Sequence, residues 1–301
     1  MKFRNAARAL LLLAAVLLSV ALTANAGVYT AVISYGDSLS DNGNFFAAAA
    51  YPPYPYWNGR FSNGPVAVEY LASSLHAPLH DYAWGGATTG LGNYIDGGSQ
   101  TSLGNFNLPG MIPEVFNLTP SSIWTMAPTS LFVVWGGAND FFLTPHGSVS
   151  TGVADIVGIV AYLKANGATH ILVPGVPDLG LTPDFYGDPT ATAWSQAFNA
   201  GLVANLPSGA TYFDTYAFMH DVVSNYGAYG FTDVVDPCWN GVSVCSNPDQ
   251  YLFWDGVHPT TAADSILAAQ FANAVPEPSS MLLLGTGIAG LAGVLKRKLS
   301  A

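Results

Sequence analysis

The chain has 301 residues, of which 50% are hydrophobic, 13% aromatic and 9% charged, and its formal net charge is −11. This composition predicts a large folded core and excludes disorder over most of the length. Between the two termini only Arg60 and Lys164 are basic, whereas every acidic residue except Glu277 lies there. The acidic part of the chain between the termini repels nucleic acid and anionic lipid headgroups. This charge excludes nucleic-acid binding and favours a neutral or zwitterionic substrate.

The first 26 residues have the features of a targeting segment. They combine a basic start with Lys2 and Arg4, an apolar run from Ala9 to Leu22, and the A-x-A sequence Ala24-Asn25-Ala26. This pattern predicts a secretory signal peptide over residues 1–26, with a retained membrane anchor as the alternative.

The first expected strand leads into a serine. The β-prone run from Val28 to Tyr35 stops at Gly36-Asp37-Ser38, and small or polar residues follow. A junction of this kind can hold a side chain at the carboxyl edge of a sheet, where α/β proteins place their sites. Taken alone, however, the short motif favours a polar turn over a catalytic serine.

Irregular structure and short elements are expected next. Consecutive Pro and Tyr residues from Phe45 to Trp57 predict a loop, which either packs on the surface or forms an apolar rim beside Ser38. Helical spacing of apolar residues begins at Pro65. A short strand over residues 78–84 is expected to break into a Gly-rich turn over residues 85–90, whose backbone N–H groups can face an anion.

Strands and helices alternate through the rest of the chain. The apolar run Leu131–Trp135 is typical of a buried parallel strand and is followed by Gly136-Gly137-Ala138-Asn139-Asp140. The other expected elements are a helix near Ile112–Phe116, helix Val149–Asn166, strand Ile171–Val173, helix Thr190–Asn205, strand Thr211–Phe213, helix Tyr216–Tyr226 and helix Thr261–Ala274. This alternation predicts the α/β class, as a single three-layer α/β/α domain over residues 27–275 with a mostly parallel sheet.

The two cysteines, Cys238 and Cys245, lie in a Pro/Asn/Gly-rich segment with six residues between them. In an exported protein this pair predicts a local disulfide. A metal site is not expected, because two thiols without nearby histidines do not make a tetrahedral ligand set.

The C-terminus resembles the bacterial PEP-CTERM sorting signal. Its Pro276-Glu277-Pro278 motif precedes a 17-residue apolar run, Ser279–Leu295, and the basic tip Lys296-Arg297-Lys298. The resemblance implies recognition by an exosortase in a Gram-negative bacterium, with residues 276–301 removed during export. The run is just long enough to cross a bilayer, and its basic end would stay cytoplasmic. Transient insertion into the inner membrane is therefore expected, and a plain C-terminal anchor is the alternative.

Four blocks in chain order together resemble the GDSL or SGNH hydrolase family. They are Gly36-Asp37-Ser38-Leu39, Gly86 within Tyr82–Ala87, Gly137-Ala138-Asn139-Asp140, and Asp255-Gly256-Val257-His258-Pro259. The segment Asn58–Pro65 and the residues Glu69–Ala72 further resemble the lipase, phospholipase and haemolysin branch of this family. The resemblance implies a flavodoxin-like α/β/α fold and a serine acyl hydrolase.

The resemblance also implies a role for each matching residue. Ser38 would be the nucleophile, His258 the general base and then the general acid, and Asp255 the residue that orients His258. The backbone N–H groups of Ser38 and Gly86 and the side chain of Asn139 would form the oxyanion hole. Gly86 is preferred to Gly85 from register with the family block.

Other polar residues are expected to support the structure. Asp37 is expected to form the turn, and Asp140 to support its loop. Arg60 would pair with a nearby Asp or meet a substrate carbonyl or phosphate. The bulky Trp84 departs from the family block and could pack against the acyl pocket. The remaining histidines are expected to be structural or exposed, namely His76, His80, His146, His170 and His220.

The sequence therefore predicts an exported serine esterase or lipase that hydrolyses carboxylic esters without metal or cofactor. Acyl transfer at the same site is one alternative. A catalytically silent surface or matrix protein is the other, although the presence of Ser38, Asn139, Asp255 and His258 opposes it.

Overall fold

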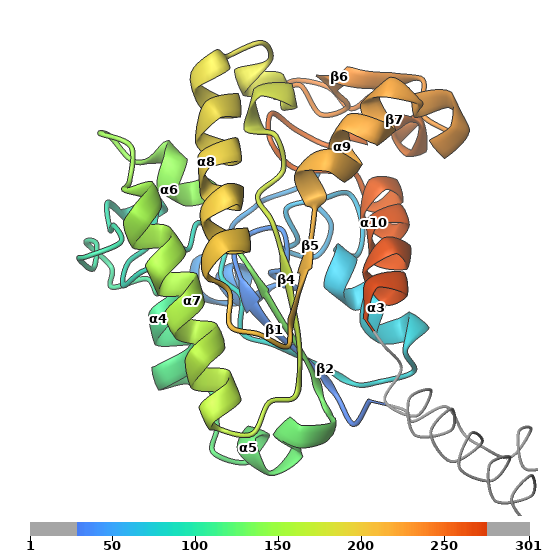
Figure 1. Ribbon diagram of the computed structural model, residues 1–301. Helices are drawn as coiled ribbons and strands as arrows, with labels where there is room; N and C mark the ends of the chain where they lie inside the picture. The colour runs from blue at the N-terminus through green and yellow to red at the C-terminus, as the bar shows by residue number, and fades with distance from the viewer. Residues whose placement is uncertain (1–28, 276–301) are drawn as a thin grey trace, which may run out of the picture. The chain divides into compact units, whose positions relative to one another are not determined.

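The structure is a computed structural model that describes residues 29–275, drawn in colour in Figure 1. The predicted signal peptide over residues 1–26 and the predicted sorting segment over residues 276–301 lie outside the described residues.

Five parallel strands form the central sheet, in the order β2-β1-β3-β4-β5. The strands are β1 (Val32–Gly36), β2 (Leu79–Asp81), β3 (Leu131–Trp135), β4 (His170–Pro174) and β5 (Ala210–Phe213). This order is that of flavodoxin-like folds, in which the chain reverses direction across the sheet between the first and third strands. The predicted α/β class and mostly parallel sheet are confirmed.

Helices cover both faces of the sheet (Figure 1). Helices α7 and α8 pack against each other on one face, and α3 and α10 on the other. The helices are α2 (Asn44–Ala49), α3 (Ala67–Ser74), α4 (Met111–Pro113), α5 (Ile123–Met126), α6 (Ala138–Phe142), α7 (Val149–Ala165), α8 (Pro189–Asn205), α9 (Thr215–Ser224) and α10 (Thr261–Ala274). A π-helical turn, Glu114–Leu118, continues α4.

The two faces of the sheet bury different side chains. On one face Ile33 and Phe132 belong to a large core cluster that also contains Ile156 of α7 and Phe198 of α8. On the other face the buried Trp135 of β3 packs edge-on against Phe271 of α10, with ring centroids 5.4 Å apart. Burial on both sides explains why β3 is continuously apolar rather than alternating.

A second, two-stranded sheet was not predicted. It pairs β6 (Asp233–Pro237) with β7 (Tyr251–Phe253) in parallel and with an irregular register. The segment between these strands contains the disulfide and is rich in Pro, Asn and Gly, so the sequence gives only a loop signal. A small apolar cluster that includes Met219, Phe231 and Leu252 backs the pair.

Helix α2 corrects the prediction of a loop throughout Phe45–Trp57. Its first turn is held by the Asp41 carboxylate, which accepts hydrogen bonds from the backbone N–H groups of Gly43, Asn44 and Phe45. The helix ends at Ala49, and the C-cap residue Ala50 has a left-handed φ of 52° just before Tyr51-Pro52. The capping carboxylate lies before the apolar run, where composition alone does not reveal it.

Candidate active site

Ser38 lies in a tight turn directly after β1. The Asp37 carboxylate accepts the Leu39 N–H at 3.0 Å, and the Asp37 carbonyl accepts the N–H groups of Ser40 and Asp41. A side chain is excluded at Gly36, because its Cβ would lie 2.1 Å from the Trp135 carbonyl oxygen. Asp37 thus forms the turn, as expected, and leaves the Ser38 hydroxyl at the carboxyl end of the sheet.

Ser38, His258 and Asp255 form a continuous hydrogen-bond chain. His258 Nε2 lies 2.8 Å from Ser38 Oγ, and His258 Nδ1 lies 2.8 Å from Asp255 Oδ2. The other carboxylate oxygen, Oδ1, accepts the backbone N–H groups of Val257 and His258. Because Nδ1 faces a carboxylate, it carries the proton, and Nε2 is left to accept one from Ser38.

The charges in this chain of bonds stabilise one another. Burial alone would lower the pKa of His258, but the charge and hydrogen bond of Asp255, with smaller contributions from Asp37 and Asp184, raise it above its ordinary value. Burial alone would raise the pKa of Asp255, but the charge of His258 and the hydrogen bonds that Asp255 accepts lower it. Asp255 is therefore a carboxylate that favours a protonated His258.

Three residues near the carboxyl end of the sheet each have an N–H group that is free to donate. Within residues 29–275 the backbone N–H groups of Ser38 and Gly86 have no hydrogen-bond acceptor. The Gly85 N–H, by contrast, is bound to Asp41 Oδ2 at 2.7 Å. Asn139 uses one N–H of its side-chain amide on the Ala87 carbonyl at 2.9 Å, which leaves its second N–H available.

The strand order explains why these three residues lie at the same edge of the sheet. The turn after β1 carries Ser38, the turn after β2 carries Gly86, and α6 after β3 carries Asn139. Strands β2 and β3 are the two neighbours of β1. Carboxyl ends of neighbouring parallel strands lie at one edge of a sheet, and here the edge is at the reversal of strand order where such folds bind ligands.

An aromatic cleft of about 660 Å³ opens beside His258 and Asp255. Its aromatic lining comes from segments far apart in the chain, namely Tyr51, Tyr56, Phe61, Tyr94 and Trp239. The ring of Phe61 packs on that of His258 at 5.2 Å. The aromatic segment after Ser38 therefore lines the cleft, which is one of the two alternatives that the sequence predicts for it.

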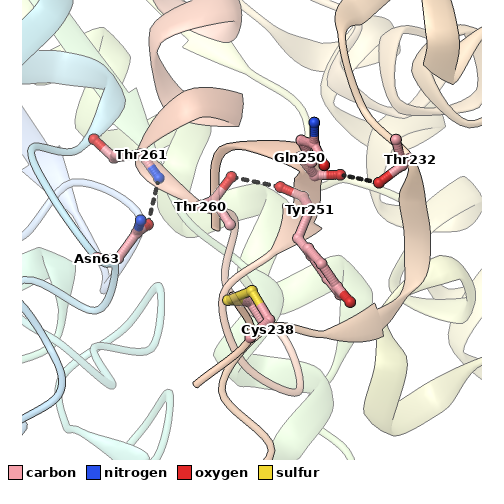
Figure 2. The surroundings of a disulfide bond; sticks show 8 residues. Asn63, Thr232, Cys238, Gln250, Tyr251, Thr260 and Thr261 are labelled. Carbon is pink, nitrogen blue, oxygen red and sulfur yellow. Dashed lines mark hydrogen bonds between the residues drawn. A yellow bond between two sulfur atoms is a disulfide. The ribbon is translucent and has the colours of Figure 1, made fainter. Parts of the chain in front are cut away.

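The disulfide loop forms another wall of this cleft. Cys238 and Cys245 are bonded, and Trp239, Asn240 and Gly241 between them line the cleft. Figure 2 shows how the segment between β7 and α10 is held: Thr260 Oγ1 donates to the Tyr251 carbonyl, and the Thr261 N–H donates to Asn63 Oδ1. These bonds fix the segment that carries Asp255 and His258.

Residues 32–271 match the GDSL-like lipase/acylhydrolase family. The chain belongs to this family. It is a GDSL-type serine ester hydrolase, which confirms the predicted enzyme class. Residues 274–298 match the PEP-CTERM protein-sorting motif, which confirms the resemblance of the C-terminus and points to an exported protein of Gram-negative bacteria.

Similar proteins cover most of this GDSL hydrolase. Thermolabile hemolysin of Vibrio parahaemolyticus is 27% identical over 275 residues, which cover 79% of this chain and 62% of the hemolysin. Phosphatidylcholine-sterol acyltransferase of Aeromonas hydrophila is 25% identical over 314 residues, which cover 83% of this chain and 92% of the acyltransferase. These matches confirm the resemblance to the haemolysin-containing branch.

A solved structure shares the fold. The crystal structure of a catalytic mutant of Axe2, an acetylxylan esterase from Geobacillus stearothermophilus, superposes with a TM-score of 0.50 and 13% identity over 82% of this chain and 94% of that chain.

Three residues of this GDSL hydrolase touch the site without having been predicted. Tyr56 donates a hydrogen bond to Asp255, the exposed Asp184 lines the cleft, and the buried Glu114 accepts the Gly36 N–H through Oε2 at 2.9 Å. Each contacts the site from a distant segment of the chain, so no local spacing in the sequence predicts the contact. The Pro/Tyr-rich composition around Tyr56 was the one available signal.

Other polar residues take supporting places. The Asp140 carboxylate accepts hydrogen bonds from Thr89 and Gln100 and so supports the loops beside Asn139. Arg60 pairs with Glu69, so its expected partner is a Glu rather than an Asp. Trp84 packs against the main core cluster and is not among the residues that line the cleft.

Residues 29–275 contain no group of three or more His, Cys, Asp or Glu side chains arranged to hold a metal ion. Within the same residues no helix has the length and apolarity needed to cross a membrane. The apolar run Ser279–Leu295, which carries the membrane prediction, lies outside them.

Proposed function

We propose that this hydrolase is an exported esterase or lipase that cleaves carboxylic esters through a Ser38-His258-Asp255 triad and an acyl-enzyme intermediate. The observation that carries the proposal is the unbroken hydrogen-bond chain from Ser38 Oγ through His258 to Asp255 at the wall of an open cleft. This arrangement supplies a nucleophile, a base and a group that orients the base.

In the first step Ser38 Oγ attacks the ester carbonyl while His258 Nε2 takes the serine proton. The imidazolium that forms donates from Nδ1 to Asp255, which is ionised and hydrogen-bonded on both oxygens. The negative oxygen of the tetrahedral intermediate accepts the N–H groups of Ser38, Gly86 and Asn139. The free N–H of Gly86, beside the occupied N–H of Gly85, supports this choice of donor.

The intermediate collapses when His258 gives its proton to the leaving alcohol, and the acyl group stays on Ser38. A water molecule, deprotonated by His258, then attacks the acyl-enzyme. The bond between the acyl carbon and Ser38 Oγ breaks, His258 returns the proton to Ser38 Oγ, and the acid leaves. Besides the ester and this water, every step uses groups of this chain.

The cleft supports a neutral or zwitterionic ester. Its aromatic walls suit acyl chains, and neither Arg nor Lys occurs among the described residues that line it. Asp184 lies on the same wall and would repel an anionic group.

Ester hydrolysis tests the proposal. The wild-type chain and Ser38→Ala are compared on p-nitrophenyl esters from acetate to palmitate. Loss of the nucleophile should lower kcat by about 10⁴-fold or more. Ser40→Ala is the matched control, because this neighbouring serine is buried and its hydroxyl has no partner within the described residues. Equal rates for the wild type and Ser38→Ala would refute the proposal, and the chain-length profile separates an esterase from a lipase.

Acyl transfer is a second candidate, favoured by the 25% identity to the acyltransferase of Aeromonas hydrophila over 92% of that protein. An alcohol acceptor would replace water in the second half of the reaction. Adding a long-chain alcohol to the ester assay distinguishes the two: a transferase forms a new ester, whereas a hydrolase releases acid alone. The silent-protein alternative predicts neither product.

Export would place the domain of residues 27–275 outside the cytoplasm. Signal-peptide cleavage after residue 26, insertion of residues 279–295 into the inner membrane, and exosortase cleavage of the tail complete this proposal. The local disulfide is consistent with an oxidising compartment. Intact-mass analysis of the mature protein tests it, since a retained N- or C-terminal segment would identify an anchored form.

A further inference from the structure

Asp255 receives a hydrogen bond from a side chain that precedes it by 199 residues. The Tyr56 hydroxyl donates to Asp255 Oδ2 at 2.7 Å, and the same oxygen accepts from His258 Nδ1 at 2.8 Å. Within residues 29–275 the only other donors to this carboxylate are His258 and the backbone of Val257 and His258. Among the described residues, Tyr56 is therefore the one residue of another segment that hydrogen-bonds to Asp255.

The structure holds the Tyr56 ring firmly. It packs edge-on against Phe61 at 6.3 Å and against Trp254 at 6.2 Å. A few residues later, Ser62 Oγ donates to the Pro259 carbonyl at 2.9 Å, just after His258. Contacts at Trp254 and Pro259 thus join the segment that contains Tyr56 to the segment that contains Asp255 and His258.

The phenol is a neutral donor. Burial, together with the negative charge of Asp255, raises the pKa of Tyr56 well above its ordinary value. Its hydrogen bond to Asp255 therefore persists through the pH range in which His258 titrates. A hydrogen bond to a carboxylate is stronger than one between neutral groups, and it stabilises the charge on the oxygen that accepts it.

We propose that Tyr56 is a positioning residue that acts through Asp255: it fixes the rotation of the carboxylate toward His258 Nδ1 and shares its negative charge. The proposal rests on the proposed roles of Asp255 and His258. Without the phenol, Oδ2 would turn away from Nδ1 or bind cleft water, so that catalysis slows. Without the phenol, the Asp255 carboxylate would also keep its full negative charge and would stabilise the protonated His258 more strongly.

The test compares Tyr56→Phe with Tyr51→Phe in the full chain. Tyr51 lines the same cleft and packs on Phe45, and its hydroxyl makes no hydrogen bond to the triad. The profiles of kcat and KM against pH are measured with p-nitrophenyl butyrate. Tyr56→Phe should lower kcat about tenfold with little change in KM and should move the acidic limb of kcat/KM up by about half a pH unit. Tyr51→Phe should keep the wild-type limb.

If Tyr56 only supported the structure, its replacement would not shift the acidic limb of the kcat/KM profile. An unchanged limb in Tyr56→Phe, or a loss confined to KM, would overturn the proposal. In an Asp255→Asn background the Tyr56→Phe change should have no further effect on kcat, and an equal loss in both backgrounds would also overturn it. These outcomes are separate from the Ser38→Ala result, which tests the proposed function itself.

A second variant serves if Tyr56→Phe does not fold. Replacing Tyr56 alone by 3-fluorotyrosine keeps its shape and makes the phenol a stronger donor. The acidic limb should then move to lower pH, opposite to the shift in Tyr56→Phe. A limb that stays in place or moves up would contradict the proposal.

Discussion

Ser38 Oγ and His258 Nε2 lie 2.8 Å apart, although 220 residues separate them in the chain. The turn after β1 holds the serine, and the segment between β7 and α10 holds the histidine. Bonds between Ser62 and Pro259 and between Asn63 and Thr261 join that late segment to the early one. The contact between Ser38 and His258 thus depends on bonds between segments that are far apart in the chain.

The pH profile of kcat/KM should reflect the raised pKa of His258. The base must be neutral to accept the serine proton, so activity should rise with pH through a midpoint above 6.5, the ordinary histidine value. Asp184→Asn removes one nearby negative charge and should lower this midpoint by about a few tenths of a pH unit, a small shift because Asp184 is exposed. An unchanged or higher midpoint in Asp184→Asn would contradict the assigned electrostatics.

Asn139 should matter for the transition state more than for substrate binding. Asn139→Asp keeps the size of the side chain but removes the N–H that faces the developing oxyanion. We expect kcat to fall by about 10²–10³-fold with KM nearly unchanged. Thermal unfolding of the same variant controls for the lost bond to the Ala87 carbonyl. A variant with normal kcat and a raised KM would exclude Asn139 from the oxyanion hole.

Asp37 should make folding depend on pH. Burial, only partly offset by the bond from the Leu39 N–H, raises its pKa from 3.8 to about 7. The folded state therefore binds a proton that the unfolded state releases, and this stabilisation is lost as pH rises from about 4 to 7. Relative to the wild type, Asp37→Asn should gain about 2–3 kcal/mol between pH 5 and pH 8 in urea unfolding. A stability difference that is constant with pH would refute this assignment.

The disulfide should stabilise the cleft wall locally. Replacing both Cys238 and Cys245 by Ser should lower the free energy of unfolding by roughly 2–3 kcal/mol, because the closed loop is short. Since Trp239 and Asn240 line the cleft, KM should also rise while the Ser38–His258 chemistry persists. Urea unfolding and steady-state kinetics measure both effects, and complete loss of kcat would show that the loop does more than shape the wall.

The strands of the central sheet were the most predictable part of the fold. Leu131–Trp135 is a continuous apolar run, and β3 occupies the same residues. Helix α10 likewise begins after Thr260, whose side chain caps it, and runs over the predicted residues. Elements without such local signals were missed: α6 has only five residues, too few to show a helical period, and β6 contains a Pro and pairs irregularly.

The site was predictable where residues occur in recognisable blocks. The residues Ser38, Asn139, Asp255 and His258 stand in such blocks, and the structure brings them to one edge of the sheet. Tyr56 and Glu114 contact the site across 199 and 78 residues of chain, at Asp255 and Gly36 respectively. A single bond formed by tertiary packing has no period or spacing in the sequence, so only the structure reveals these two.

Ser38 is proposed to be a nucleophile that His258 and Asp255 activate. An alkyl p-nitrophenyl phosphonate tests it most directly, because an activated serine displaces p-nitrophenolate and keeps the phosphonyl group. We expect one equivalent of p-nitrophenolate per chain and a mass increase on the peptide that contains Ser38. Labelling should be absent in Ser38→Ala, strongly slowed in His258→Ala and normal in Ser40→Ala. Labelling of another residue, or equal labelling of wild type and Ser38→Ala, would contradict this role of Ser38.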